Sequence, residues 1–348
     1  MRKSSHGRFG FVFTLLLLAA MPRIGRAQTG PELLIKPWPR DRVIEADAQA
    51  DFYNETNTNN PANDGTGGRA VLSLSEEDSE GRLRVFPRDE HVRADPRFGY
   101  NLTYLHLNTN DPHLPKNLTD ESVAVGTGIA DINGWEAGIT VGVGNAAAGA
   151  FNDGNGLYGQ FDLLVGHDIS KTSKLGIVLD YNGNRSFLPD VPLPGVVYTK
   201  IIDPTLLLAV GFPLASVTWT PDKANTLNRQ LTIDATYAIP DNFEVNADYA
   251  VIDSTGPAGK VGAFASFTNR LLPFHDNDAA VGRYRIFFEQ NRAELGVRWT
   301  PVPLVSAVLA GGYAFDQRFH YGWDSNNYGE LAKLGDSLYT RVGLEFRY

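Results

Sequence analysis

The eight residues Arg341-Val342-Gly343-Leu344-Glu345-Phe346-Arg347-Tyr348 decide the expected fold. Their even-numbered positions carry Val, Leu, Phe and Tyr, whereas the odd-numbered positions carry Arg, Gly, Glu and Arg. Because successive side chains of a β-strand point to opposite faces, the segment predicts a strand with one apolar and one charged face. Such a strand is typical of a closed barrel in lipid, where the outer face meets hydrocarbon and the inner face meets water. The alternative is an amphipathic strand of a soluble β-sandwich.

The same two-residue alternation recurs in the segments 134–145, 229–238, 243–251 and 292–300. A helix would instead group its apolar residues three and four positions apart. We therefore expect strands whose apolar side chains point outward into lipid. The residues expected to point outward are Trp135, Leu231, Ile233, Phe243, Val245, Leu295, Val297, Leu344 and Phe346.

Turn residues divide the chain into about twelve alternating segments, with a range of ten to fourteen. Short and long connections between these segments alternate along nearly the whole chain. Outer-membrane barrels have this pattern, with short periplasmic turns and longer external loops. The expected fold class is all-β, a transmembrane antiparallel up-and-down β-barrel over residues 97–348. The expected strands are 97–108, 121–131, 134–145, 156–167, 173–184, 205–220, 229–239, 241–252, 258–268, 283–300, 304–319 and 337–348. Pro213 interrupts one of them and predicts a bulge or a bend.

The N-terminal residues 1–27 have the features of a signal peptide. Arg2, Lys3 and Arg8 are followed by an apolar stretch over 9–20, and Ala27 precedes the expected cleavage site. The apolar stretch is shorter than the roughly 20 residues that a transmembrane helix needs. The sequence therefore predicts export rather than an inner-membrane anchor.

Residues 28–96 differ in composition from the rest of the chain. They contain Pro-rich, Asn-rich and acidic pieces, which predict a periplasmic or luminal extension of low order. One stretch, Ile44–Phe52, alternates between apolar and polar residues in the way a strand does. The alternative is therefore an extra hairpin, which would raise the strand count to about fourteen.

Composition excludes several classes of function. The chain has no Cys, so it has neither disulfides nor thiolate metal sites. Its formal net charge is −9, and loss of residues 1–27, which contain basic but no acidic residues, makes the remaining chain more negative. An acidic chain is a poor partner for nucleic acid. The 14 Tyr, 19 Phe and 35 Gly residues suit a barrel with aromatic girdles.

The sequence contains no recognisable catalytic or metal-binding motif. There is neither an HExxH helix motif nor a GxSxG nucleophile elbow. The acidic run His275–Asp278 lacks the length and spacing of a calcium loop, so we interpret it as a solvated external loop. We expect no enzyme activity, no cofactor and no metal.

At the level of motifs, the chain resembles uncharacterised bacterial outer-membrane β-barrel proteins. The resemblance covers 97–348 and rests on 214–221 (LASVTWTP), 285–299, 311–315 with 318–319, and the terminal strand. That strand, with Gly343, Phe346 and Tyr348, is similar to the sorting signal of such barrels. The resemblance implies the outer membrane as location, its lipid bilayer and the barrel assembly machinery as partners, and no catalytic residues.

The barrel interior is the remaining candidate site. Charged residues that alternate with apolar neighbours must face inward, because Arg or Lys facing lipid near the midplane costs about 2–4 kcal/mol. We expect an acidic arc on the middle strands, to which Asp162 and Asp180 also belong, facing an Arg-rich arc on the last strands. The residues proposed to line the passage are Asp234, Glu244, Asp248, Arg292, Arg298, Arg341 and Arg347. The predicted function is a porin-like channel for small polar solutes; the alternative is a structural or adhesive outer-membrane protein that acts through its external loops. The same charges would pair across the interior if the barrel were plugged.

Overall fold

The computed structural model describes residues 33, 43–59, 70–85, 96–111, 113–149, 156–203, 206–212, 214–219, 231–238, 242–253, 259–276 and 284–348. The expected signal peptide lies outside these residues. The described residues contain no helix long and apolar enough to span a membrane. They form one sheet of 18 strands. The strands are β1 (Ile44–Tyr53), β2 (Thr56–Asn59), β3 (Ala70–Arg84), β4 (Arg97–Thr109), β5 (Asn117–Ile132), β6 (Trp135–Ala147), β7 (Leu157–Ser170), β8 (Ser173–Asn182), β9 (Leu193–Asp203), β10 (Leu206–Gly211), β11 (Leu214–Trp219), β12 (Leu231–Ala238), β13 (Asn242–Asp253), β14 (Lys260–His275), β15 (Arg285–Val302), β16 (Val305–Gly322), β17 (Tyr328–Leu334) and β18 (Ser337–Arg347).

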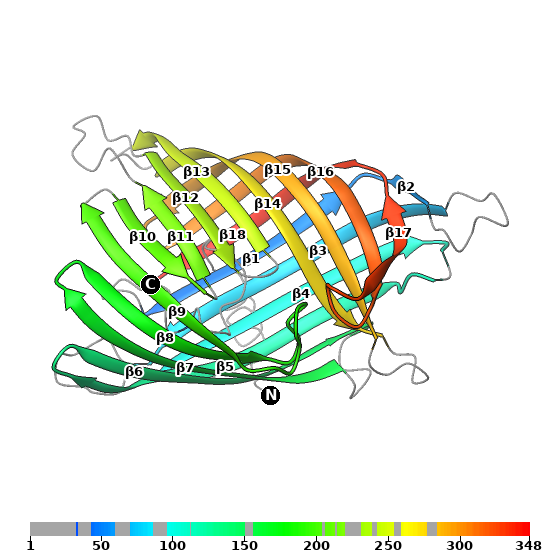
Figure 1. Cartoon of the computed structure of the whole chain (residues 1–348). Helices are drawn as coiled ribbons and strands as arrows, with labels where there is room; N and C mark the ends of the chain where they lie inside the picture. The colour runs from blue at the N-terminus through cyan, green and yellow to red at the C-terminus, as the bar shows by residue number, and fades with distance from the viewer. Residues whose placement is uncertain are drawn as a thin grey trace, which may run out of the picture.

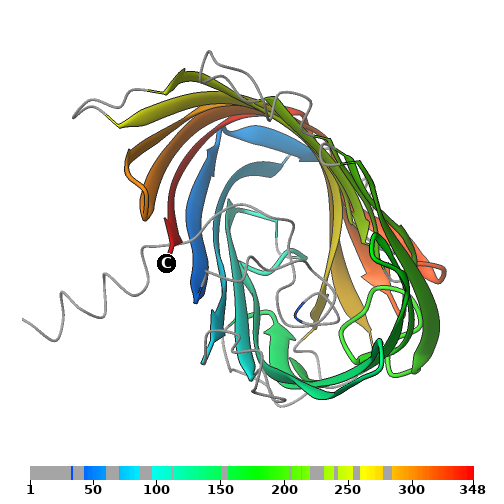
Figure 2. The same ribbon diagram turned by 90° about the vertical axis from the view of Figure 1, so that its left-hand side faces the viewer.

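The sheet closes into a ring. Each wall strand pairs with its neighbours in an antiparallel manner, and the first strand, β1, pairs with the last, β18, through partners such as Ala48 and Leu344. The short strands β2 and β17 prolong β1 and β18, so the ring has 16 positions. Figure 2 shows the strands around this ring from one end. The all-β antiparallel barrel predicted from the sequence is confirmed.

The wall is apolar outside and carries buried charged side chains inside over much of its height, the reverse of a soluble protein. Leu295 is 70% exposed, and Trp135, Val297 and Leu344 are also exposed. In contrast, charged side chains such as Arg270, which is 0% exposed, are buried. A β-sandwich would instead bury the apolar faces of its strands between two sheets. These four residues therefore point outward as predicted, whereas Phe346 is half-buried and the side chains of Leu231, Ile233, Phe243 and Val245 lie outside the described residues.

The 16 strand positions are four more than the twelve expected and exceed the range of ten to fourteen. Two of the four additional strands lie in residues 28–96, for which the sequence predicts an extension of low order. β1 with β2 forms one wall strand and β3 forms the next. The structure there corresponds to the extra hairpin. The acidic run Glu76-Glu77-Asp78 favours disorder when only its own neighbours in sequence are considered. In the structure, Glu76 pairs with Arg270 of β14, and Asp78 accepts hydrogen bonds from the adjacent strands β1 and β4.

The other two additional strands lie near the middle of the chain. β9 occupies part of an expected loop, because the prolines around Pro194 favoured an irregular segment. The expected strand 205–220 is instead the antiparallel hairpin of β10 and β11. Pro213 lies outside the described residues, between these two strands, so the chain reverses direction where we had predicted only a bulge or a bend.

The two ends of the barrel differ. One end, here called the turn end, has the first residue of β1, the last of β18 and several tight connections, including the turn at Asn133 and Gly134, which both have positive φ. Positive φ at both central residues is the geometry that an Asn-Gly hairpin favours. The opposite end, here called the loop end, has the last residues of β6, β8 and β14 and the connection over residues 183–192. Figure 1 shows the turn end on the left and the loop end on the right.

The wall is lower on one side of the loop end. β10 and β11 have 6 residues each and β12 has 8, whereas β14 has 16 and β15 has 18. Asn242, the first residue of β13, pairs with Arg270, and β14 continues beyond that point to His275. β10–β13 therefore stop short of the loop end that β14 and β15 reach (Figure 1).

Aromatic side chains mark two levels of the outer face. Trp135, Trp219 and Trp299 are exposed near the turn end. Phe315 lies beside Phe267 and Tyr313 further toward the loop end, with ring centroids 6.4 and 6.0 Å away, respectively. Aromatic girdles of this kind border the apolar band of outer-membrane barrels.

Replacing Leu295, which lies midway along β15, with Arg is expected to lower the free energy of unfolding by about 2–4 kcal/mol, because the charge would face the hydrocarbon midplane. Urea unfolding of protein inserted in lipid vesicles measures this loss. The control is Val191→Arg, since Val191 is exposed in the connection between β8 and β9 rather than on a strand. Equal stability of the two variants would contradict a lipid-facing position for Leu295.

Candidate functional site in the barrel interior

An ion-pair network lies inside the barrel near β1. Asp51 accepts hydrogen bonds from two arginines: Arg292 Nη1 lies 2.6 Å from its Oδ2, and Arg341 Nε lies 2.8 Å from its Oδ1. Arg341 Nη1 also lies 3.0 Å from Oε1 of Glu294. Asp51 and Arg341 are register partners on β1 and β18, which puts both side chains on the inner face. These strands meet because the ring closes here.

The network continues on β3 and β14. Glu76 forms a two-pronged ion pair with Arg270, and its Oε2 lies 3.5 Å from Nη1 of Arg292. Tyr53 donates to Glu76 over 3.2 Å, and Arg270 Nη2 donates to Gln290 Oε1 over 2.6 Å. Buried charges are stable only when they are paired and hydrogen-bonded. We call Asp51, Glu76, Arg270, Arg292, Glu294 and Arg341 the interior ion-pair network.

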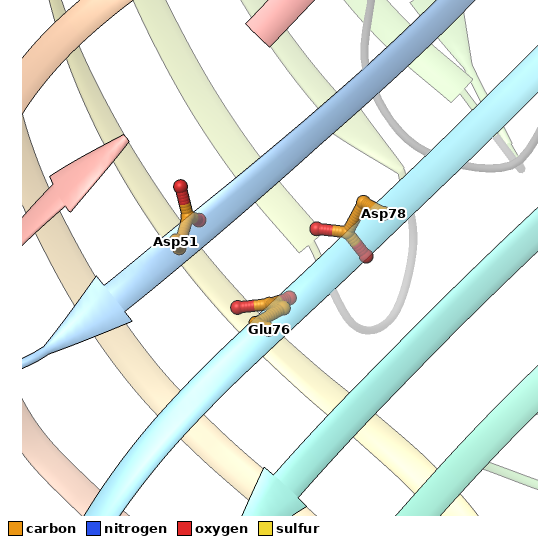
Figure 3. A group of neighbouring side chains, drawn as sticks. All are labelled: Asp51, Glu76 and Asp78. Atoms are coloured by element: carbon orange, nitrogen blue, oxygen red, sulfur yellow. The ribbon is translucent and has the colours of Figure 1, made fainter. Parts of the chain in front are cut away.

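Two carboxylates of this network, those of Asp51 and Glu76, have the spacing of a metal site together with the nearby Asp78. One oxygen from each of Asp51, Glu76 and Asp78 lies within 4.8 Å of the others, and Figure 3 shows their origin on β1 and β3. However, Arg292 and Arg341 already pair with Asp51, and Arg270 pairs with Glu76. Asp78 in turn accepts hydrogen bonds from Gln49 and Thr103. This arrangement favours an internal ion-pair role for these acids over binding of a cation.

A second charged group lies closer to the turn end. Arg298 Nε lies 2.9 Å from Glu345 Oε1, and Arg347 Nη2 lies 3.7 Å from its Oε2. Glu345 is buried, whereas the side chains of the two arginines are 19% and 34% exposed. All four arginines predicted to line the passage therefore form ion pairs with inward-facing acids.

Those acids are not the ones predicted from the sequence. The side chains of Asp234, Glu244 and Asp248 lie outside the described residues. Their strands, β12 and β13, belong to the same part of the ring as the arginines, since the register runs from Glu244 through Thr268 to Arg292. The arrangement in which these acids stand across the lumen from the arginines is therefore wrong.

The strands that do stand opposite carry other acids. Strands β7–β9 lie half a ring from β15 and β18. Within them, Asp162 of β7 and Asp180 of β8 are register partners, and both are buried. Asp180 pairs with Arg185 over 2.5 Å. Asp162 and Asp180, which the sequence analysis assigns to the acidic arc, therefore lie on strands opposite those that carry the arginines.

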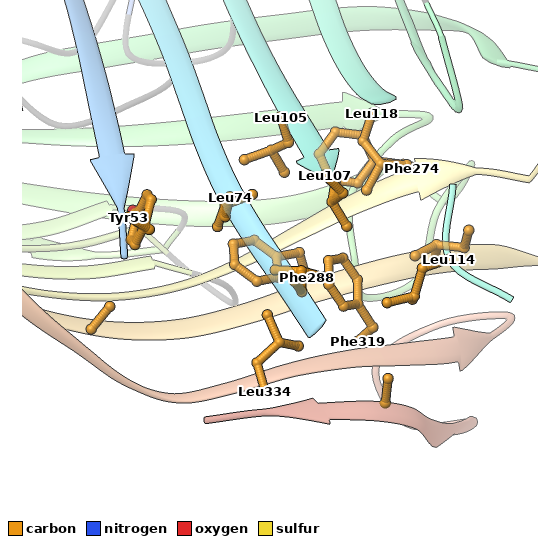
Figure 4. Close-up of a cluster of buried hydrophobic side chains, with 14 of the residues drawn as sticks. Tyr53, Leu74, Leu105, Leu107, Leu114, Leu118, Phe274, Phe288, Phe319 and Leu334 are labelled. Carbon is orange, nitrogen blue, oxygen red and sulfur yellow. The ribbon is translucent and has the colours of Figure 1, made fainter. Parts of the chain in front are cut away.

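The loop end of the interior is apolar. The side chains of this apolar cluster come from strands at both ends of the chain and converge in Figure 4. Phe288 and Phe319 stack with ring centroids 4.9 Å apart, and neither ring is solvent-exposed. The buried members are Tyr53, Leu72, Leu74, Leu105, Leu107, Leu114, Leu118, Phe274, Ile286, Phe288, Ala314, Phe319, Ala332, Leu334 and Tyr339.

One residue before the first strand also lies inside the wall. Leu33 is fully buried, and its carbonyl oxygen accepts a hydrogen bond of 2.8 Å from Arg97 Nη1. A Cβ atom built on Gly126 of β5 would lie 3.2 Å from Leu33 Cδ2. Leu33 therefore packs against the inner face of β5.

The sequence analysis missed Asp51, Glu76 and Arg270 as site residues. The alternation over Ile44–Phe52 was the available signal for Asp51, because it puts the acids of that stretch on a single face. Arg270 lay in an expected loop, since β14 is longer than its clear alternating part. No local pattern reveals that these residues meet, because 194 residues separate Glu76 from Arg270.

The fold and the charged interior define an outer-membrane-type β-barrel. No protein-family profile matches the chain, and no curated protein matches it in sequence. Solved barrel structures are similar in architecture. One is a FadL homologue of Pseudomonas aeruginosa, at 10% identity and a TM-score of 0.37 over 88% of this chain and 90% of that chain. Another is the toluene transporter TodX of Pseudomonas putida, at 9% identity and a TM-score of 0.37 over 94% and 98%. A third is OprB of Pseudomonas putida, at 13% identity and a TM-score of 0.28 over 100% and 99%. At these values the likeness is one of general architecture and does not indicate a solute.

Proposed function

We propose that this chain forms a porin-like channel for small polar solutes in the cell outer membrane. The observation that carries the proposal is a ring of 16 strands with a charged inner face. Side chains just fill a barrel of about eight strands, whereas barrels of about 16–18 strands leave an aqueous passage. The inward-facing side chains of Arg298 and Arg347 are 19% and 34% exposed, so the interior near the turn end is partly accessible to solvent, which favours a polar passage over a dry, plugged interior.

Conductance of purified protein in planar bilayers tests the proposal. Discrete current steps that scale with salt concentration are the expected result. Swelling of protein-containing liposomes in sugars of graded size would then set the size limit for solutes. The structural or adhesive alternative becomes the better account if the protein inserts and neither current nor swelling is observed.

Ion selectivity should depend on the charge group around Glu345. We expect the double variant Arg298→Gln with Arg347→Gln to shift the preference of the channel toward cations, because Glu345 loses both of its ion-pair partners. Arg341 stays intact in this variant because it belongs to the interior ion-pair network. The measurement is the reversal potential in a salt gradient.

The matched control for this variant is Arg318→Gln. Arg318 pairs with Asp316 over 2.5 Å, and the side chains of both residues are more than 30% exposed. Its neighbour in sequence, Phe319, belongs to the inward-facing apolar cluster, so Arg318 lies on the outer face. A reversal potential that moves equally in both variants would contradict a role of the Glu345 group in selectivity.

We also propose that Gly343, Phe346 and Tyr348 act in recognition by the barrel assembly machinery. The main chain of Tyr348 helps to close the ring, since its N–H donates to the Ile44 carbonyl over 3.0 Å and its carbonyl accepts from Ile44 N–H over 2.8 Å. Its side chain is exposed. Changing only the side chain therefore separates recognition from ring closure.

Tyr348→Asp is expected to reduce the yield of membrane-inserted protein several-fold, whereas the inserted fraction should unfold at an unchanged urea concentration. Tyr348→Phe keeps the aromatic ring and serves as the control, with yield near that of the wild type. Membrane fractionation followed by a folded-versus-unfolded mobility shift measures both quantities. A normal yield of the Asp variant would rule out a recognition role.

A further inference from the structure

Two opposite points of the wall touch at the loop end. β6 and β14 lie half the ring apart in either direction, yet Ala147 and His275 at their ends pair in parallel. Ala148 N–H donates to the His275 carbonyl over 3.2 Å. This contact divides the loop end into two lobes. We call them the core lobe, bounded by β14–β18 and β1–β6, and the low lobe, bounded by β6–β14.

The two lobes are closed in different ways. The core lobe holds the apolar cluster, with side chains such as Phe274, Leu118 and Phe288 fully buried. The wall of the low lobe includes β10–β13, which stop short of the loop end, so the strands themselves do not close this lobe. Its loop end is instead crossed by residues 183–192, which connect β8 to β9.

Residues 183–192 reach from β8 and β9 to the opposite wall. Asn184 Nδ2 donates to the Pro273 carbonyl of β14 over 3.2 Å. Arg285 Nη1, from β15, donates to the Arg185 carbonyl over 2.9 Å. Ser325 N–H donates to the Ser186 carbonyl over 2.8 Å. The three crossing residues are buried, so this part of the connection lies within the barrel.

The connection is held in shape by its own arginine. Arg185 pairs with Asp180 over 2.5 Å, and its Nη1 donates to the carbonyls of Leu188 and Val191 over 3.4 and 3.1 Å. These contacts hold residues 185–191 together and tie them to Asp180 of β8, so the segment moves as one piece about its junction with β8 when its contacts to the opposite wall break. The contacts named above between it and the opposite wall are polar. Individual hydrogen bonds contribute little net stability, because water replaces them when they break.

We propose that residues 183–192 form a gate over the low lobe and that Arg285 is the main residue that holds it closed. The inference rests on the proposed channel function and deepens it, because it identifies the element that regulates passage. The core lobe cannot serve as the gate, since opening it would expose the whole apolar cluster to water. The low lobe opens when a few hydrogen bonds of residues 184–186 break, namely those to Asp120 of β5, to β14, to β15 and to Ser325.

A reversible cross-link tests the gate. The chain has no Cys, so Ser186→Cys with Ser325→Cys introduces a single pair of thiols. The main-chain hydrogen bond between these residues brings their backbones close, and a disulfide needs a Cα separation of about 4.4–6.8 Å. Oxidation is expected to reduce conductance at least tenfold relative to the same protein after reduction. The control is Ser170→Cys with Ser173→Cys, a register pair at the turn end, where oxidation should not change conductance.

Arg285→Ala provides the opposite change without a cross-link. It removes the donor to the carbonyls of Arg185, Ser186 and Trp323, so channel open time is expected to rise several-fold. The folded state of each variant is checked by its mobility shift on heating. Equal conductance of the oxidised and reduced Ser186/Ser325 variant would overturn the gate and leave the channel function intact. If neither the wild type, the reduced variant nor Arg285→Ala conducts, the channel function itself fails.

Discussion

Replacing Asp51 with Asn is expected to lower the free energy of unfolding of the barrel by about 3–5 kcal/mol, because it leaves buried arginine charge without its main partner. Asp51 contacts both Arg292 and Arg341, and all three side chains are at least nine-tenths buried. Asn has nearly the same volume as Asp, so a loss of packing does not explain the effect. Urea unfolding in lipid vesicles measures it.

A double-variant cycle shows whether the loss comes from the ion pair. Arg341→Gln should be destabilising alone, and its combination with Asp51→Asn should cost less than the sum of the two. The control is Asp316→Asn, which breaks a half-exposed pair with Arg318 and should cost at most about 1 kcal/mol. Strict additivity of the Asp51 and Arg341 changes would contradict a coupled interior ion-pair network.

Replacing Phe288 with Ala is expected to cost about 3–5 kcal/mol, because it removes a buried ring and leaves a cavity in the apolar cluster. Phe288 stacks on Phe319, and the guanidinium carbon of Arg270 lies 5.6 Å from its ring centroid. The change therefore weakens the junction between the apolar cluster and the interior ion-pair network. Hydrogen exchange of β15 and β16 amides near the loop end should accelerate in parallel.

Phe98→Ala is the matched control for this change. Phe98 is an exposed aromatic residue near the turn end, so its removal creates no internal cavity. We expect a clearly smaller loss of stability than for Phe288. A loss of equal size at the two positions would show that the loop end of the barrel is not held together by internal packing.

These two predictions also bear on how the barrel could conduct. If the core lobe is as stable as its packing indicates, the low lobe is the part of the loop end that can open at small cost. The Phe288→Ala and Arg285→Ala variants distinguish opening of the core lobe from opening of the low lobe. The first should reduce stability without the increase in open time, and the second should increase open time with a smaller loss of stability.

The sequence by itself determined the class of fold. In segments such as 134–145 and 341–348, the alternation of apolar and polar residues fixes which side chains face lipid, because the period of a strand is two. Trp135, Leu295, Val297 and Leu344 are exposed for this reason. The same local rule placed Arg292, Arg298, Arg341 and Arg347 on the inner face, where the structure has them paired with acids.

Only the tertiary structure decided the number of strands and the ion-pair partners. β10 and β11 have 6 residues each and lie two residues apart in sequence, and β10 is almost entirely apolar, so alternation does not separate them. β3 carries an acidic run, in which Glu76 pairs with the distant Arg270 of β14. Asp51 meets Arg341 across 290 residues because ring closure makes the first and last strands neighbours. Closure depends on all of the strands together, whereas alternation depends on nearest neighbours in sequence. The side of a strand that faces lipid can therefore be predicted locally, but the residues that meet inside the barrel cannot.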